Sequence, residues 1–214
     1  MTIFTLNGIK RSAKTTTDIL GRELERLGHK WVPLRYPVVR GWSGRSRTAR
    51  RERALALYKA IKSYPGPRFL IAHSNGCAEA CAVMDLAGTD IFQGVLFIAP
   101  AVNSDWTFPQ EAFQRLVIVH NTHDKVLAAG SLLPGNHIWG GLGRKGYTGF
   151  HEGTGRIECV MDDKKRTFWS HSYYFQPPYI DWLVSISSRL VHNKIIKPVF
   201  GPISPAIDQE SPAA

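Results

Sequence analysis

The chain has 214 residues, 43% of them hydrophobic, and a net charge of +10. This length allows one domain with a full hydrophobic core, and the apolar content excludes a largely disordered chain. The three cysteines, Cys77, Cys81 and Cys159, form neither a disulfide framework nor a zinc-binding pattern. The start of the chain lacks the pattern of a signal peptide, and no apolar run is long enough to span a membrane. We therefore expect a cytoplasmic protein.

Short apolar runs alternate along the chain with longer segments of helical periodicity. The apolar runs predict strands, in chain order, at residues 3–6, 31–36, 68–73, 94–98, 116–119 and 156–161. The helical segments lie at residues 15–28, 48–64, 75–86 and 178–191. The strand segments are apolar almost throughout, which is typical of strands covered on both faces. The predicted fold class is therefore α/β, a three-layer α/β/α sandwich with a mostly parallel central sheet of about six strands.

Two stretches fall outside this alternation. Residues 134–155 are rich in glycine, and we predict an irregular surface loop there. Residues 197–214 contain several prolines, which predicts a tail that is partly disordered. We expect residues 1–196 to form a single domain.

The segment Ala72-His73-Ser74-Asn75-Gly76 follows one predicted strand and begins a helix. A sharp turn at this point would lift the Ser74 hydroxyl out of the sheet, and small residues on either side would let strand and helix approach closely. The start of the helix also supplies free N–H groups and the positive end of the helix dipole, which would stabilise a negatively charged intermediate. The pattern indicates a nucleophilic serine.

This small-x-Ser-x-small pattern resembles the Gly-x-Ser-x-Gly turn of the α/β-hydrolase superfamily, with Ala72 in place of the first glycine. In that superfamily the acid of a catalytic triad comes next in the chain, and the histidine follows the last strand. Asp124 comes directly after the second strand that follows Ser74, and His171 lies between the last strand and the last helix. The resemblance covers about residues 1–192 and implies Ser74 as nucleophile, His171 as its base and Asp124 as the residue that orients the base.

The same resemblance implies an oxyanion hole made of two backbone N–H groups. One belongs to Asn75, directly after the nucleophile. The other is expected from Ile9, in the Asn7-Gly8-Ile9 loop after the first strand. Asn7 stands where many members of the superfamily have histidine, so the assignment of Ile9 rests on position alone.

Each of these residues also has a structural interpretation. Asp124 could instead cap a short helix that begins near Val126. His171 could instead be a structural histidine that packs beside neighbouring aromatic residues. His73, His120 and His123 are rival bases by their closeness in sequence to the serine or the acid. His73 lies inside the turn itself, where its ring cannot easily reach the serine hydroxyl in line.

The predicted function is a serine hydrolase that cleaves a carboxylic ester through an acyl-serine intermediate, without a cofactor. No long insertion separates residues 99 and 115, so we expect an open, lidless site for a small-molecule or surface-presented ester. A thioesterase or an amidase or peptidase would use the same triad. His120, His123 and Asp124 resemble a metal-ligand cluster but lack a second cluster to partner them, so no metal is expected.

A third interpretation is a non-catalytic binding module. The positive charge is concentrated in the first third of the chain, where arginines would attract an anionic polymer or surface: Arg40, Arg45, Arg47, Arg50, Arg51 and Arg53. A solvated helix face accounts for the same pattern. No aromatic ladder is interleaved with the arginines, so nucleic acid is not favoured as a partner.

Overall fold

The computed structural model describes residues 1–8, 17–36, 47–109, 111–131, 140–149, 154–162 and 168–193. Ile9, Arg40, Arg45, the side chain of Arg47 and the predicted tail at 197–214 lie outside the described residues. What the sequence predicts for these residues stays a prediction. No helix in the described part of the chain combines the length and the apolar character needed to cross a membrane.

Six strands form one sheet in the order β2-β1-β3-β4-β5-β6, and every neighbouring pair is parallel. Their bounds are β1 Thr2–Leu6, β2 Lys30–Leu34, β3 Arg68–His73, β4 Thr89–Ile98, β5 Glu111–His120 and β6 Arg156–Met161. This confirms the predicted sheet. From β1 the chain moves to one edge of the sheet, and from β3 it moves toward the other edge. The carboxyl ends of β1 and β3 therefore meet at a switch point, where α/β sheets bind ligands.

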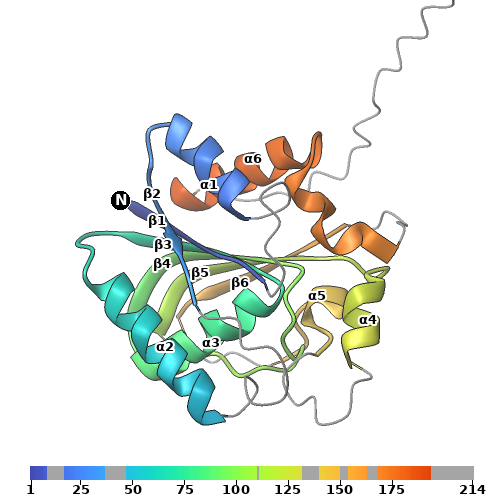
Figure 1. Cartoon of the computed structure of the whole chain (residues 1–214), viewed down its shortest axis with the longest axis horizontal. Helices are drawn as coiled ribbons and strands as arrows, with labels where there is room; N and C mark the ends of the chain where they lie inside the picture. The colour runs from blue at the N-terminus through green and yellow to red at the C-terminus, as the bar shows by residue number, and fades with distance from the viewer. Residues whose placement is uncertain are drawn as a thin grey trace, which may run out of the picture.

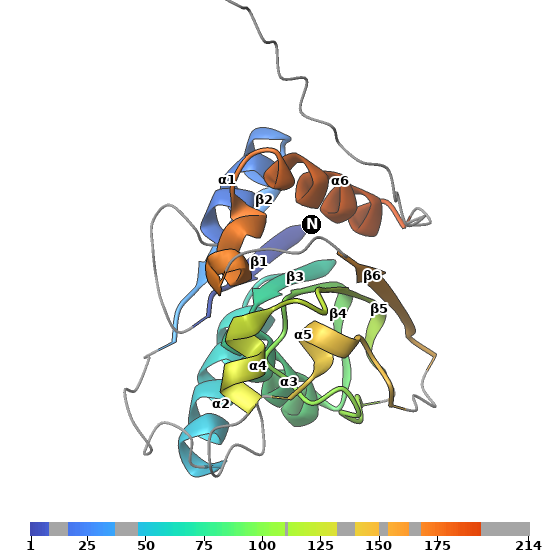
Figure 2. The same cartoon turned by 90° about the vertical axis from the view of Figure 1, so that its right-hand side faces the viewer.

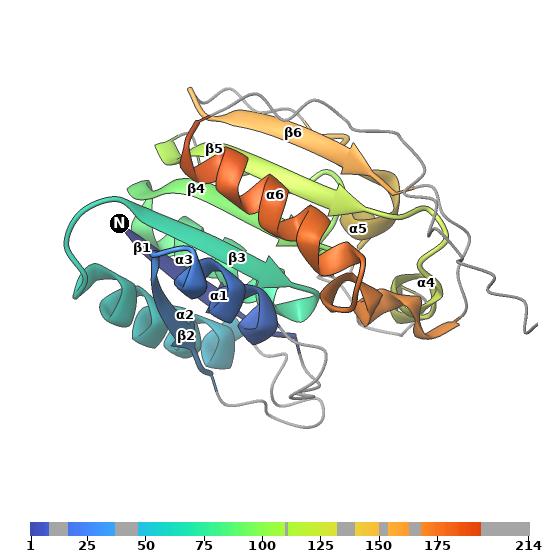
Figure 3. The same cartoon turned by 90° about the horizontal axis from the view of Figure 1, so that it is seen from above.

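Helices cover both faces of the sheet (Figures 1 and 3). On one face lie α1 (Thr17–Arg26) and α6 (Tyr179–Val191), and on the other lie α2 (Arg47–Lys62) and α3 (Asn75–Ala87). Each face has its own core of buried apolar side chains. The three-layer arrangement is confirmed, and it explains why the strand segments carry almost no polar residues at their centres.

Strand β3 shows how the two cores are built. Successive side chains of a strand point to opposite faces. Leu70 and Ala72 accordingly pack into the core beneath α2 and α3, whereas Phe69 and Ile71 pack into the core beneath α1 and α6. The side chain of the last strand residue, His73, follows Phe69 and Ile71 onto the second face.

The remaining short elements lie at the carboxyl ends of the strands (Figure 2). They are α4 (Lys125–Ser131), α5 (Leu142–Lys145) and the 3₁₀ segment η2 (Phe168–Phe175). The prediction of an irregular surface loop at 134–155 is wrong at Leu142–Lys145, which form a short helix in which Leu142 is fully buried. Glycine allows this close packing, since a Cβ at Gly143 would lie 2.7 Å from the carbonyl oxygen of Pro100.

Candidate functional site

Ser74 occupies a strained turn between β3 and α3. Its backbone angles are φ 54° and ψ −125°, in the left-handed half of φ that residues with a side chain rarely adopt. The turn is held by its neighbours, because the N–H of Ser74 donates to Ile98 O at 3.1 Å and the N–H of Ala101 donates to Ser74 O at 3.1 Å. The predicted sharp turn at the serine is therefore present.

Small residues surround this turn. A Cβ added at Gly76 would lie 2.5 Å from the backbone oxygen of Leu6, so only glycine lets α3 begin this close to β1. A Cβ added at Gly8 would lie 3.0 Å from Ser74 Cβ and 3.4 Å from Ser74 Oγ. The loop that follows β1 therefore runs directly past the serine side chain.

Asp124 and His171 are joined by a short hydrogen bond between two buried side chains. His171 Nδ1 lies 2.6 Å from Asp124 Oδ2, and because a carboxylate only accepts, Nδ1 carries the proton. The other carboxylate oxygen, Oδ1, accepts the N–H of Leu127 at 3.0 Å and caps α4. The predicted helix cap is therefore present, and the second oxygen of the same carboxylate contacts His171.

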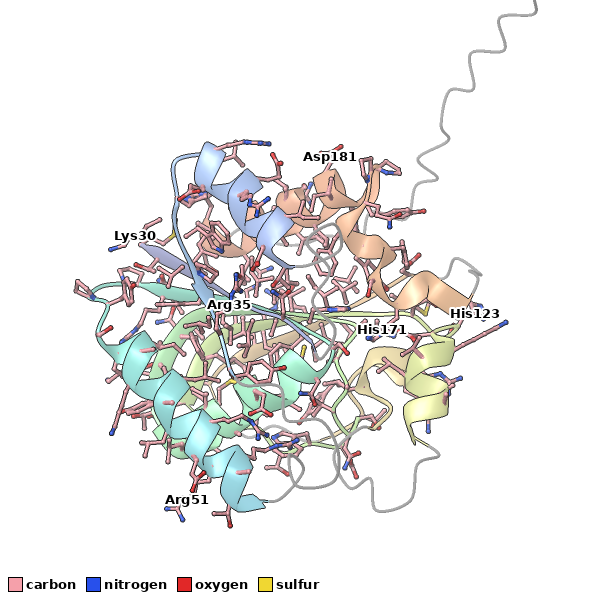
Figure 4. All side chains as sticks on the ribbon, viewed as in Figure 1. Lys30, Arg35, Arg51, His123, His171 and Asp181 are labelled. Carbon is pink, nitrogen blue, oxygen red and sulfur yellow. The ribbon has the colours of Figure 1, made fainter. Side chains whose placement is uncertain are left out.

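The proton on Nδ1 leaves His171 Nε2 with a free lone pair. Nε2 is buried and makes no hydrogen bond within the described part of the chain, including none to Ser74 Oγ. The imidazole nevertheless lies beside the serine turn, since its centroid is 4.9 Å from the ring of His73, the residue before Ser74. Figure 4 shows His171 at the end of the sheet near α4. The structure thus brings the predicted base and the predicted acid together, and it places the ring of His171 beside the residue that precedes Ser74.

Residues 39–131 match a family model described as serine hydrolase, and this segment holds Ser74 and Asp124. Among solved structures, the chain resembles an esterase from Pyrobaculum calidifontis, with TM-score 0.58 and 13% identity over 90% of this chain and 76% of that chain. It also resembles mouse alpha/beta hydrolase domain-containing protein 10, with TM-score 0.57 and 11% identity over 90% of each chain. The chain has the α/β-hydrolase fold.

A further likeness is to a sugar hydrolase from Lactococcus lactis, with TM-score 0.55 and 16% identity over 90% of each chain. No curated protein matches the chain. The serine hydrolase match and the shared fold together support a hydrolase.

The other two rival histidines have different surroundings in this hydrolase fold. His120 is buried, and its Nδ1–H donates to Arg144 O at 3.3 Å, which ties β5 to α5. Burial lowers the pKa of His120. His123 lies at the periphery of the molecule (Figure 4). Within the described ranges, no group of three or more His, Cys, Asp or Glu side chains is arranged to hold a metal ion.

Tyr36, which the sequence did not single out, bridges the two sides of the serine turn. Its hydroxyl donates to Asn7 O at 2.8 Å and accepts a hydrogen bond from Asn75 Nδ2 at 3.3 Å. Burial is the main cause that raises the pKa of Tyr36 to about 12, so the hydroxyl keeps its proton at neutral pH. Tyr36 lies two residues after β2, the strand beside β1, and the sequence predicted it only as the last residue of the strand at 31–36.

Asn7, like Ala72, departs from the superfamily pattern, and its contacts account for the asparagine. Its Oδ1 accepts the backbone N–H of Thr17 at 2.8 Å and the Thr17 hydroxyl at 2.7 Å, at the start of α1. Its Nδ2 donates to Asp18 Oδ1 at 3.2 Å. Asp18 in turn pairs with Arg35 through two hydrogen bonds of 3.1 and 2.7 Å. Asn7 therefore anchors the loop beside the serine to α1.

The described arginines of the predicted basic patch differ in their surroundings. Arg53 is buried and donates to both carboxylate oxygens of Glu79, at 3.1 and 2.8 Å. Arg50 Nε lies 4.0 Å from the same carboxylate. Arg51 is exposed and extends away from α2 (Figure 4). Including Arg53 among the partner-binding arginines is therefore wrong, because its guanidinium is engaged inside the protein.

Proposed function

We propose that this chain is a serine hydrolase that cleaves a carboxylic ester through an acyl-serine intermediate. Ser74 is the nucleophile, His171 the general base and Asp124 the residue that orients the base. The observation that carries the proposal is the buried hydrogen bond from His171 Nδ1 to Asp124 Oδ2 at 2.6 Å, directly beside the strained turn at Ser74. The similarity to an esterase supports the choice of an ester bond.

In the first half of the reaction Ser74 Oγ attacks the carbonyl carbon of the ester. His171 Nε2, whose lone pair is free, takes the serine proton as the new C–O bond forms. The tetrahedral intermediate then collapses, and the bond from carbon to the leaving oxygen breaks. His171 returns the proton to that oxygen, so an alcohol departs and an acyl-serine remains.

In the second half a water molecule repeats these steps. His171 removes a proton from the water, and the resulting nucleophile attacks the acyl carbon. Collapse of the second intermediate breaks the bond to Ser74 Oγ, and His171 gives the proton back to the serine. Asp124 stays ionised throughout and stabilises the imidazolium in both halves. The steps use the chain's own groups and water.

The negative charge of each intermediate requires two hydrogen-bond donors. The backbone N–H of Asn75, at the start of α3, is the first donor in this proposal, and the N–H of Ile9 is the second. Gly8, the residue before Ile9, lies against Ser74, which supports a donor from this loop. Removal of one such donor typically costs about 2.7–4 kcal/mol of transition-state stabilisation.

The proposal is tested by the hydrolysis of p-nitrophenyl acyl esters by the wild-type chain and Ser74→Ala. We expect kcat/KM to fall at least about a thousandfold in the variant, since the nucleophile is lost. Ser63→Ala, an exposed serine just after α2, is the matched control and should keep full activity. Equal hydrolysis by wild type and Ser74→Ala would overturn the proposal. Parallel thioester and anilide substrates identify the bond that is cleaved fastest.

A further inference from the structure

His73 is a buried imidazole that the proposed reaction does not use. The alternation of β3 points its ring toward the layer of α1 and α6, where it packs against η2. Its ring lies 4.9 Å from the ring of His171 and 5.1 Å from the ring of Phe175, the last residue of η2. The residue beside the proposed nucleophile is thus in direct contact with the proposed base.

A hydrogen bond also joins the two histidines. His73 Nε2 lies 3.0 Å from the carbonyl oxygen of His171, and because a carbonyl only accepts, His73 donates. Burial, followed by the repulsion that a protonated His171 exerts, lowers the pKa of His73 to about 3. The ring is therefore neutral at neutral pH, and its Nε2 carries the proton that the bond requires.

The hydrogen bond from His73 Nε2 to the His171 carbonyl holds the backbone of His171 in place. His171 belongs to η2, a 3₁₀ segment, and the hydrogen bonds of such segments are poorer than those of an α-helix. The side chain of His171 is held from α4 by Asp124, and its backbone is held from β3 by His73. Together the two bonds fix the base relative to the strand that carries Ser74.

A neutral His73 also favours the protonation of His171 in the proposed reaction. During the proposed reaction His171 becomes positively charged, and a second positive ring 4.9 Å away would oppose this step. A neutral donor to the backbone holds the base in place without that repulsion. The Asp124 carboxylate favours protonation of His73, but burial outweighs it and keeps the pKa of His73 low.

We propose that His73 is a positioning residue, which holds the backbone of His171 so that its ring stays beside the turn that carries Ser74. This inference rests on the proposed function. Misplacing a reacting group by about 1 Å can cost a hundredfold in rate. Loss of the bond is therefore expected to lower kcat and leave KM unchanged.

The decisive comparison is between His73→Gln and His73→Asn. A glutamine amide reaches about as far as Nε2 and can still donate to the His171 carbonyl, whereas asparagine is one methylene too short. We expect His73→Gln to keep kcat within about threefold of wild type, and His73→Asn to lose about ten- to a hundredfold in kcat with KM unchanged. His120→Gln, another buried histidine bonded to a backbone carbonyl, is the control for a purely structural loss.

A second readout does not depend on turnover. The proton on His171 Nδ1 should give a far-downfield NMR signal, because it lies in a short bond to a carboxylate. We expect that signal to persist in His73→Gln and to broaden or vanish in His73→Asn, with the circular dichroism spectrum unchanged. Equal kcat and an equal signal in both variants would overturn the inference. If the wild-type chain hydrolyses no ester, the proposed function fails, and a signal that still separates the two variants shows that His73 positions His171.

Discussion

Asp124 and His171 form a 2.6 Å hydrogen bond through Oδ2 and Nδ1, and the second oxygen of Asp124 caps α4 at Leu127. One carboxylate therefore fixes both the tautomer of the His171 imidazole and the start of α4. This double role allows the two effects to be separated by mutation.

Asp124→Asn should remove activity and keep the fold. Asparagine is as good a helix cap as aspartate, so the melting temperature should change little. Its amide would donate toward Nδ1 and favour the tautomer that has no lone pair at Nε2, which lowers kcat about 10,000-fold in a comparable triad. Asp124→Ala should in addition lose about 0.5–2 kcal/mol of stability with the cap. Kinetics and thermal melts check both, and full activity of Asp124→Asn would contradict the assignment.

Tyr36→Phe should weaken the site without changing the nucleophile. The variant removes the hydroxyl that bridges Asn7 O and Asn75 Nδ2, and a buried hydrogen bond typically contributes about 0.5–1.5 kcal/mol. We expect a lower melting temperature and a kcat reduced about tenfold, because both loops beside Ser74 lose a restraint. Tyr64→Phe keeps the ring contact with Phe4 and serves as control. Equal kcat in the two variants would show that the bridge has no part in catalysis.

The arginines of α2 should respond unequally to substitution. Arg53→Met leaves the buried Glu79 carboxylate without its main partner, and breaking a buried ion pair typically costs about 3–5 kcal/mol. Arg51→Met alters an exposed side chain and should change stability by less than about 0.5 kcal/mol. Urea unfolding measures both, and the pair Arg53→Met with Glu79→Leu should recover much of the loss. Similar stability of the two single variants would refute the buried pair.

Stability should fall on acidification because of His73. Its pKa is lowered from 6.5 to about 3 in the folded chain, first by burial and then by His171. Between these two pH values the unfolded chain binds a proton that the folded chain does not. The free energy of unfolding is therefore highest above pH 6.5, and it decreases as the pH falls from 6.5 toward 3. One such group contributes up to about 1.4 kcal/mol per pH unit.

His73→Gln removes this contribution. Urea unfolding of wild type and variant at a series of pH values should therefore show a stability difference that shifts in favour of the variant as pH falls from 7 to 4. Parallel pH dependences for the two proteins would mean that His73 is not held neutral by the fold.

Much of the fold could be predicted because its strands are short apolar runs between helices. Strand β3 and its turn into α3 have the predicted bounds, since a buried strand followed by small residues around a serine has few other solutions. The first residues of β4 and β5 were missed because they lie at the exposed amino-terminal edge of the sheet. Gln93 and Gln114 are exposed there and break the apolar pattern.

The site was predictable only as a chain order of serine, acid and histidine. Periodicity places residues on faces, but it does not say which loops meet at the end of a sheet. Tyr36 bonds to Asn7 across 29 positions and His73 bonds to His171 across 98, so neither role is visible in a local pattern. The helix at Leu142 was missed for a related reason, because glycines that signal a loop here allow close packing.

The most direct test of the central claim is mass-spectrometric mapping of a fluorophosphonate adduct on the full chain. The reagent reacts with a serine only if a base activates it and the site admits the probe. The account predicts a single adduct on the peptide that carries Ser74, with labelling lost in Ser74→Ala and strongly slowed in Asp124→Asn. An unlabelled wild-type chain, or an adduct on another serine that survives Ser74→Ala, would contradict it.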